Sequence, residues 1–186
     1  KSAGGGILLY GPPGCGKTFY AKAIAKECGA AFFNVEIDDI LDMWMGQSEK
    51  NIDSLFAAAR TQRPCVIFID EIDALGRSRN RSQHASITTT VNKFLAELEG
   101  LDSDNDNILV LGATNAVWDV DGAFKRPGRF DRVMFVPPPD EIGRAEIFRL
   151  GLNKLPVADD IDISSLAKQT DKFSGADIQG LLDRAA

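Results

Sequence analysis

The sequence predicts an α/β fold in which a parallel sheet is covered by helices on both faces. Three observations support this prediction. Short runs of apolar, β-forming residues alternate with helical patterns along the chain, which is the order of parallel strand–helix–strand units. The first of these runs leads directly into a glycine-rich loop that is followed by a helix. A later run ends in two adjacent carboxylates.

The periodicity of apolar residues defines the expected elements. The expected strands are residues 7–10, 31–36, 65–69, 108–112 and 133–136, and the helices between them cover about residues 17–28, 48–61 and 86–99. The three prolines at 137–139 cannot continue a strand or a helix, so we expect a domain boundary there. We therefore expect residues 1–138 to form a large domain, of which the start at Lys1 predicts that an N-terminal part is missing, and residues 139–186 to form part of a small helical domain.

Composition and charge restrict the possible functions. The chain has 186 residues, of which 44% are hydrophobic and 26% charged, as in an ordinary globular protein. No apolar run approaches the roughly 20 residues of a membrane span. The net charge of −6 argues against a broad nucleic-acid surface, but a local basic groove stays compatible with it. The odd set Cys15, Cys28 and Cys65 lacks metal-ligand spacing, which predicts reduced thiols in a cytoplasmic protein.

The glycine-rich loop at residues 11–18 matches the phosphate-binding pattern G-x-x-x-x-G-K-[ST]. Its glycines allow the backbone N–H groups to face phosphate oxygens, and the following helix adds its N-terminal dipole. Lys17 is expected to reach the β- and γ-phosphates, and Thr18 to offer its hydroxyl to Mg²⁺. The alternative is a glycine-rich turn that matches by accident, which the flanking strand and helix make less favourable. The loop consists of Gly11, Pro12, Pro13, Gly14, Cys15, Gly16, Lys17 and Thr18.

The carboxylates that follow the run at 65–69 are Asp70 and Glu71. Ligands of parallel sheets bind beyond the carboxyl ends of the strands, so Asp70 is expected to face the Mg²⁺ of a bound nucleotide. Glu71 points differently and could orient or deprotonate the water that attacks the γ-phosphate. The alternative is a solvated strand end whose acids cap the next helix.

With the segments that follow them, these two motifs resemble the AAA ATPases of the AAA+ superfamily over essentially the whole chain. Residues 11–18 are similar to the Walker A motif and residues 66–71 to the Walker B motif. The resemblance implies a P-loop NTPase sheet of five strands in the order 5-1-4-3-2, a helical lid, and a ring that is usually a hexamer. It also implies hydrolysis of ATP to ADP and phosphate with Mg²⁺. The spacing resembles remodelling members such as valosin-containing protein, katanin and spastin, and selects none of them.

The resemblance assigns roles to three further polar residues. Asn115 follows the run at 108–112 and looks like the sensor 1 residue that reads the γ-phosphate and its water. Arg126 and Arg129 flank a Pro-Gly turn and look like arginine fingers, whose planar cations suit charge that develops on a phosphate. The competing interpretations are a turn asparagine and surface ion pairs.

Two further segments resemble functional parts of the family. Gly175 and Ala176 open a small-domain helix and would sit against the nucleotide. Trp44, Met45 and Gly46 lie where the family has its pore loop, which grips an extended polypeptide. Tryptophan offers broad apolar contact with little demand on sequence. The alternative is a tryptophan buried against a neighbouring helix.

Three function classes therefore remain. The favoured class is an ATP-driven protein unfoldase or remodeller that acts as a cytoplasmic homo-hexamer on polypeptide, with unknown adaptors, no nucleic-acid partner and no membrane span. The second is an AAA+ motor that acts on nucleic acid, which the acidic balance and the aromatic loop oppose. The third is a nucleotide-binding scaffold without turnover, which the intact Lys17, Asp70, Glu71 and Asn115 oppose.

Overall fold

The computed structural model describes residues 6–37, 47–75, 85–100, 106–153, 155 and 161–185. The contacts divide the chain into two compact units. The first unit comprises Lys1–Tyr10 and Lys17–Phe135, and the second comprises Gly11–Gly16 and Val136–Ala186.

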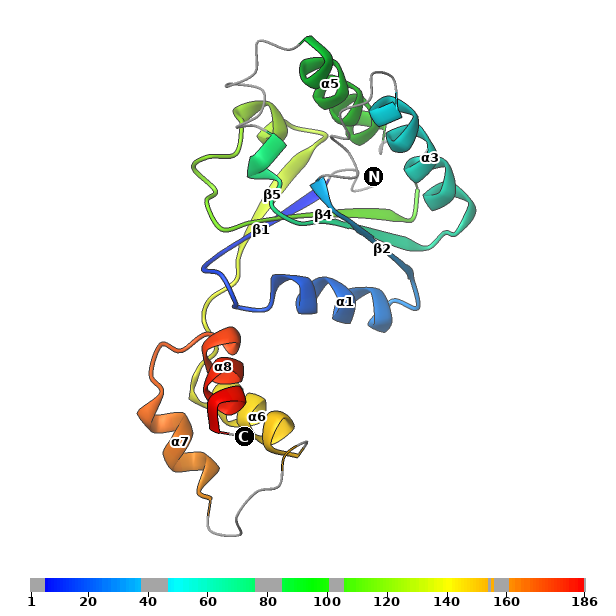
Figure 1. Cartoon of the computed structure of the whole chain (residues 1–186). Helices are drawn as coiled ribbons and strands as arrows, with labels where there is room; N and C mark the ends of the chain where they lie inside the picture. Colours follow the sequence, from blue (N-terminus) through cyan, green and yellow to red (C-terminus); the bar gives the residue numbers. More distant parts are fainter. Residues whose placement is uncertain are drawn as a thin grey trace. The chain divides into compact units, whose positions relative to one another are not determined.

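The first unit is built on a five-stranded parallel sheet with the strand order β2-β3-β4-β1-β5 (Figure 1). This is the predicted order 5-1-4-3-2 counted from the opposite edge, so the predicted fold class is confirmed. The strands are β1 (Gly6–Tyr10), β2 (Ala31–Val35), β3 (Cys65–Ile69), β4 (Ile108–Thr114) and β5 (Phe130–Phe135).

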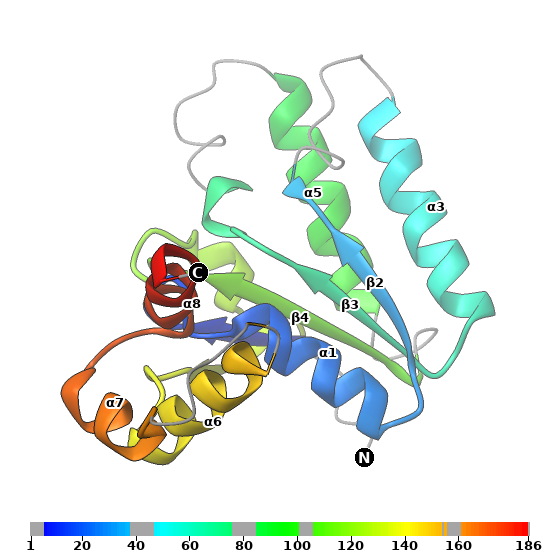
Figure 2. The same cartoon turned by 60° about the horizontal axis from the view of Figure 1, so that its bottom comes forward.

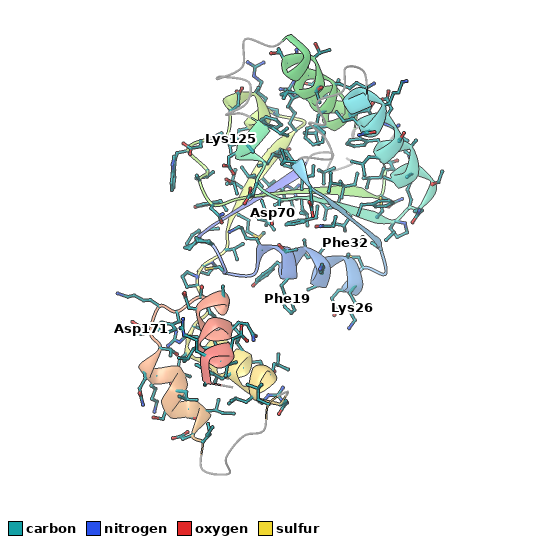
Figure 3. All side chains as sticks on the ribbon, in the orientation of Figure 1. Phe19, Lys26, Phe32, Asp70, Lys125 and Asp171 are labelled. Atoms are coloured by element: carbon teal, nitrogen blue, oxygen red, sulfur yellow. The ribbon has the colours of Figure 1, made fainter. Side chains whose placement is uncertain are left out.

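Helices cover both faces of this sheet. Helix α1 (Lys17–Glu27) lies on one face, and α3 (Gln47–Thr61) and α5 (Ala85–Glu99) lie on the other (Figures 1 and 2). A short 3-10 helix, η2 (Gly122–Lys125), leads into the turn before β5. Figure 3 shows Phe19 pointing away from the sheet on the outer side of α1, where it is 74% exposed.

The interior strand β3 is apolar on both faces because it contributes to two hydrophobic cores. Cys65, Ile67 and Ile69 belong to the core under α3 and α5, whereas Val66 and Phe68 belong to the core under α1. All five side chains are at most 2% exposed. This explains why β3 reads in the sequence as a continuous apolar run and not as an alternating one.

The edge strand β5 begins earlier than the sequence predicts, at Phe130 and not at residue 133. Phe130 is fully buried and pairs with Gly6, but the charged Asp131 and Arg132 that follow it interrupt the apolar run. Charged residues are tolerated there because every residue of β5 after Phe130 is exposed. The apolar pattern therefore marks only the second half of the strand.

The second unit contains the helices α6 (Glu141–Leu152), α7 (Ile163–Gln169) and α8 (Gly175–Ala185). They pack around Phe148, Ile178 and Leu182. Arg144, which is 5% exposed, donates from Nε and Nη2 to the carbonyl oxygen of Ala167 at 3.0 and 2.9 Å. None of the helices in the described part of the chain combines the length and the apolar character needed to cross a lipid bilayer.

Candidate nucleotide site

Three strands of the first unit end beside one another. Tyr10 at the end of β1 is paired with Thr114 at the end of β4, and Ile69 at the end of β3 is paired with Gly112 of β4. Because the strands are parallel, the residues that follow them, among them Asp70 (labelled in Figure 3) and Asn115, gather at one edge of the sheet. This is the edge where an open α/β sheet binds its ligand.

The first turn of α1 reaches two of these strand ends with consecutive residues. Lys17 is 7% exposed, and its Nζ donates a hydrogen bond to Oδ1 of Asn115 at 2.7 Å. The next residue, Thr18, donates from Oγ1 to Oδ2 of Asp70 at 3.4 Å. The structure therefore joins these four residues in two pairs, whose members are 98 and 52 positions apart in the sequence.

The pair formed by Thr18 and Asp70 has donor atoms that fit Mg²⁺. A hydroxyl and a carboxylate are hard oxygen ligands, and Mg²⁺ bound with a nucleotide uses one or two protein carboxylates together with phosphate oxygens and water. Within the described residues, no three or more His, Cys, Asp or Glu side chains gather as a metal cage.

Glu71 occupies an unusual backbone position. Its φ is 53°, in the left-handed region that residues with a Cβ rarely adopt. The reversal is held by three neighbours: Oδ1 of Asp70 accepts from the Glu71 N–H at 2.9 Å, the Ile72 N–H donates to the Ala113 carbonyl at 3.0 Å, and the Ala74 N–H donates to the Glu71 carbonyl at 2.8 Å. Such strain is stored mainly at functional sites. The exposed Glu71 side chain thus leaves the strand end in a direction set by the turn.

One contact at this edge was missed by sequence reasoning. Oγ1 of Thr114 donates to Oδ1 of Asp73 at 2.6 Å, and the two residues are 1% and 3% exposed. The sequence gives only a weak signal for this contact, namely that each residue lies close to a predicted site residue. Thr114 directly precedes Asn115, and Asp73 follows Glu71 by two residues. Nothing in that spacing indicates that the two side chains meet.

The loop of Gly11–Gly16 belongs by its contacts to the second unit. Gly14 has a φ of 73°, and a Cβ built there would lie 2.6 Å from Cβ of Ala176 and 2.8 Å from Oγ of Ser174. The Ala176 N–H donates to the Gly14 carbonyl at 3.3 Å. Glycine is therefore required at position 14 both by its backbone conformation and by the close approach of the α8 start. Of the predicted lid residues, Ala176 contacts this loop directly, and a Cβ built on Gly175 would lie 3.2 Å from the Gly14 carbonyl oxygen.

Helix α8 begins with a reciprocal cap. Oδ2 of Asp177 accepts from the Ser174 hydroxyl at 2.7 Å and from the Ser174 N–H at 2.9 Å, and Oγ of Ser174 accepts from the Asp177 N–H at 3.2 Å. These hydrogen bonds, first that from the hydroxyl and then that from the backbone, lower the pKa of Asp177. The cap fixes the residues that pack on Gly14.

The two predicted arginine fingers differ in their surroundings. Arg129 has a side chain that is 12% exposed; its Nε and Nη2 contact Oε1 of Glu99 at 2.9 and 2.8 Å, and its Nη1 donates to the Ala123 carbonyl at 2.6 Å. Arg126 is exposed. The chain turns between them, with a φ of 82° at Gly128 and a hydrogen bond of 3.1 Å from the Arg129 N–H to the Arg126 carbonyl. The same turn thus carries Arg129, which is bonded to neighbouring residues, and Arg126, which is exposed to solvent.

The predicted pore-loop residues Trp44, Met45 and Gly46 lie outside the described residues.

The three cysteines Cys15, Cys28 and Cys65 are not joined in disulfides. Burial raises the pKa of the Cys65 thiol.

Comparison with known families agrees with this geometry. A sequence model of the ATPase family associated with various cellular activities (AAA) matches residues 7–138, and a model of the AAA+ lid domain matches residues 160–186. The first match covers the whole described sheet except Gly6, and it includes every polar residue named above at the carboxyl edge. The chain therefore belongs to the AAA family of nucleotide-binding proteins and is an ATPase.

Proposed function

We propose that ATP is hydrolysed at the carboxyl edge of the sheet by the residues that the sequence singles out there. The observation that carries this proposal is that consecutive residues of α1 contact two strand ends, Lys17 at Asn115 and Thr18 at Asp70. An ammonium, a hydroxyl, an amide and a carboxylate then converge at the edge where parallel sheets bind ligands. The sequence motif of residues 11–18, which ends in Lys17 and Thr18, is the phosphate-binding pattern that supports this proposal.

Glu71 acts as the general base in this proposal. Its carboxylate accepts a proton from water as the water oxygen bonds to the γ-phosphorus; the bond from that phosphorus to the bridging oxygen breaks, and ADP leaves. Lys17 holds the β- and γ-phosphates, and Asn115 orients the γ-phosphate and the water. Thr18 and the Asp70 side chain would hold Mg²⁺ bound with the nucleotide, and the ion would supply positive charge to the phosphates.

The decisive variant is Glu71→Gln, because the amide keeps the shape of the side chain but cannot accept the proton. We expect turnover to fall by about 10²–10⁴-fold, the usual contribution of a general base, while ATP still binds. The matched control is Glu146→Gln, which makes the same change at an exposed carboxylate that pairs with Arg149 on α6. A Glu71→Gln rate within a few-fold of the unsubstituted protein would contradict the role of Glu71.

We further propose that the ATPase works in a ring, usually a hexamer, and that Arg126 acts on the nucleotide of a neighbouring subunit. Its exposure on a tight turn supports this role, since a finger must reach beyond its own chain. Arg129 supports the turn through Glu99 and the Ala123 carbonyl and completes the cationic pair.

A mixing experiment tests action in trans. Arg126→Ala protein should bind ATP and hydrolyse it slowly, and mixing it with Glu71→Gln protein should restore part of the activity. In mixed rings the first variant supplies an intact Glu71, and the second supplies an intact Arg126. Mixed rings that stay inactive at every ratio would argue against trans action.

Hydrolysis is proposed to drive the unfolding or remodelling of polypeptide gripped by Trp44, Met45 and Gly46. The support is the sequence resemblance of this segment to the pore loop of the family. Trp44→Ala should leave folding and basal turnover intact and abolish substrate-stimulated turnover, and Trp44→Tyr should keep much of it because an aromatic face remains. A large loss of thermal stability in Trp44→Ala would place Trp44 in the core and remove this proposal.

A further inference from the structure

We propose that Asp73 and Thr114 form a positioning pair that sets the geometry of Glu71 and Asn115 for hydrolysis. The pair joins the turn after β3 to the end of β4, the two segments that carry these residues. The inference rests on the roles proposed above for Glu71 and Asn115. Asp73 and Thr114 touch neither ATP nor the attacking water in this scheme, so their effect is on placement.

The hydrogen bond between Thr114 and Asp73 is short and buried. The Thr114 hydroxyl donates to the Asp73 carboxylate at 2.6 Å, with the two residues 1% and 3% exposed. Hydrogen bonds to ionised acceptors are shorter and stronger than neutral ones, and a buried carboxylate that loses a donor is costly. The two side chains are therefore held in a single arrangement.

The hydroxyl of Thr114 also controls the backbone on the far side of Asn115. While it donates to Asp73, it accepts from the N–H of Ala116 at 3.0 Å. Asn115 lies between these two anchored residues, and its own Oδ1 accepts from Lys17. The direction of the Asn115 amide thus depends on a hydroxyl that makes two bonds at once.

The carboxylate of Asp73 anchors the other side, at the reversed turn of Glu71. A non-glycine residue with a φ of 53° persists only when its surroundings over-determine it. The turn is held at its start by Asp70, in the middle by the bond from Ile72 to Ala113, and at Asp73 by Thr114. The second and third of these restraints come from β4, so β4 helps to place both Asn115 and the general base.

The test measures kcat and the ATP dissociation constant for Thr114→Val, which keeps the shape of the side chain and removes the hydroxyl. We expect kcat to fall by about 10–100-fold, the loss that follows from slight misplacement of reacting groups, with ATP affinity within about twofold. Thr114→Ser restores the hydroxyl and should recover most of the activity. Asp73→Asn keeps an oxygen that can accept the hydrogen bond but removes the charge of the carboxylate. It should therefore lower kcat less than Thr114→Val does.

A double-mutant cycle separates positioning from general support of the fold. Once Thr114→Val has removed the hydroxyl, adding Asp73→Asn should lower kcat no further. The matched control is Thr170→Val on the second unit, where a 6% exposed threonine donates to the Leu166 carbonyl at 2.8 Å. It removes a comparable bond and should leave kcat unchanged below the melting temperature.

Three results would overturn the proposal: an unchanged kcat in Thr114→Val, an equal loss of ATP affinity and kcat, or additive effects in the cycle. If Thr114→Val does not fold, the kcat of Asp73→Asn tests the proposal by itself. An unchanged kcat in folded Asp73→Asn protein would also overturn the proposal. The failure of the proposed function is distinguishable. An active Glu71→Gln protein refutes the role of Glu71, whereas an inactive Glu71→Gln protein beside a fully active Thr114→Val protein refutes only the positioning pair.

Discussion

Replacing Glu71 by glycine should make the protein more stable and catalytically inactive. The backbone at this position has a φ of 53°, and left-handed backbone costs a residue with a Cβ about 1–2 kcal/mol. Glycine removes that cost but loses about 0.5–1 kcal/mol more backbone entropy on folding. The net gain then lies between about 0 and 1.5 kcal/mol, and its midpoint of about 0.75 kcal/mol corresponds to a rise of about 1.5–3 °C in Tm for a chain of this length.

The assay compares Glu71→Gly with Glu71→Ala by thermal unfolding and by ATP turnover. Both variants lose the carboxylate and should be inactive, but only glycine relieves the left-handed conformation. Lys172→Gly is the matched control for the backbone effect, since Lys172 is exposed and has a φ of 64° on the second unit. It should raise stability without changing turnover. A Glu71→Gly protein no more stable than Glu71→Ala would refute the idea that the turn stores strain.

The remaining predictions concern the phosphate-binding lysine, the two arginines and the cap of α8. Lys17→Ala should weaken ATP binding by about 10–100-fold, as expected for losing a charged hydrogen-bond donor, and unchanged affinity in calorimetry would contradict the phosphate-binding role. Arg129→Ala should lower Tm because it leaves Glu99 and the Ala123 carbonyl without their donor, whereas Arg126→Ala should leave Tm unchanged and slow hydrolysis only in the assembled protein. The lowered pKa of Asp177 adds stability above its ordinary value of 3.8 that is lost as pH falls through the folded pKa. Ser174→Ala should therefore be less stable than the unsubstituted protein at neutral pH, and circular dichroism should show the gap closing in acid.

The sheet could be predicted from the sequence because each strand carries its own signal. Buried parallel strands are continuous apolar runs, and β3 matches the predicted residues 65–69 at both ends. The motif residues could be placed at one edge because parallel strands must end there together. The family resemblance then supplied the strand order, which local patterns do not contain.

The finer geometry of the site could not be predicted, because it depends on pairs far apart in the chain. Asp73 and Thr114 are 41 positions apart, and the bonds from Arg129 to Glu99 span 30. Whether such side chains meet depends on strand register and on turn conformation. A left-handed glutamate has no sequence signature, since glycine or asparagine would be the expected residue there. As a result, Arg126 and Arg129, which belong to the same sequence motif, differ in their hydrogen bonds and exposure.

The placement of β3 between two hydrophobic cores has a consequence for amide hydrogen exchange. A fluctuation that separates this strand from the sheet must open both cores at once, so its amides should exchange only through global unfolding. The edge strand β5, exposed along most of its length, can detach locally and exchange faster. Asp70 is therefore attached to a strand that both cores hold in place, and its carboxylate should keep its position when the edge strand β5 detaches locally.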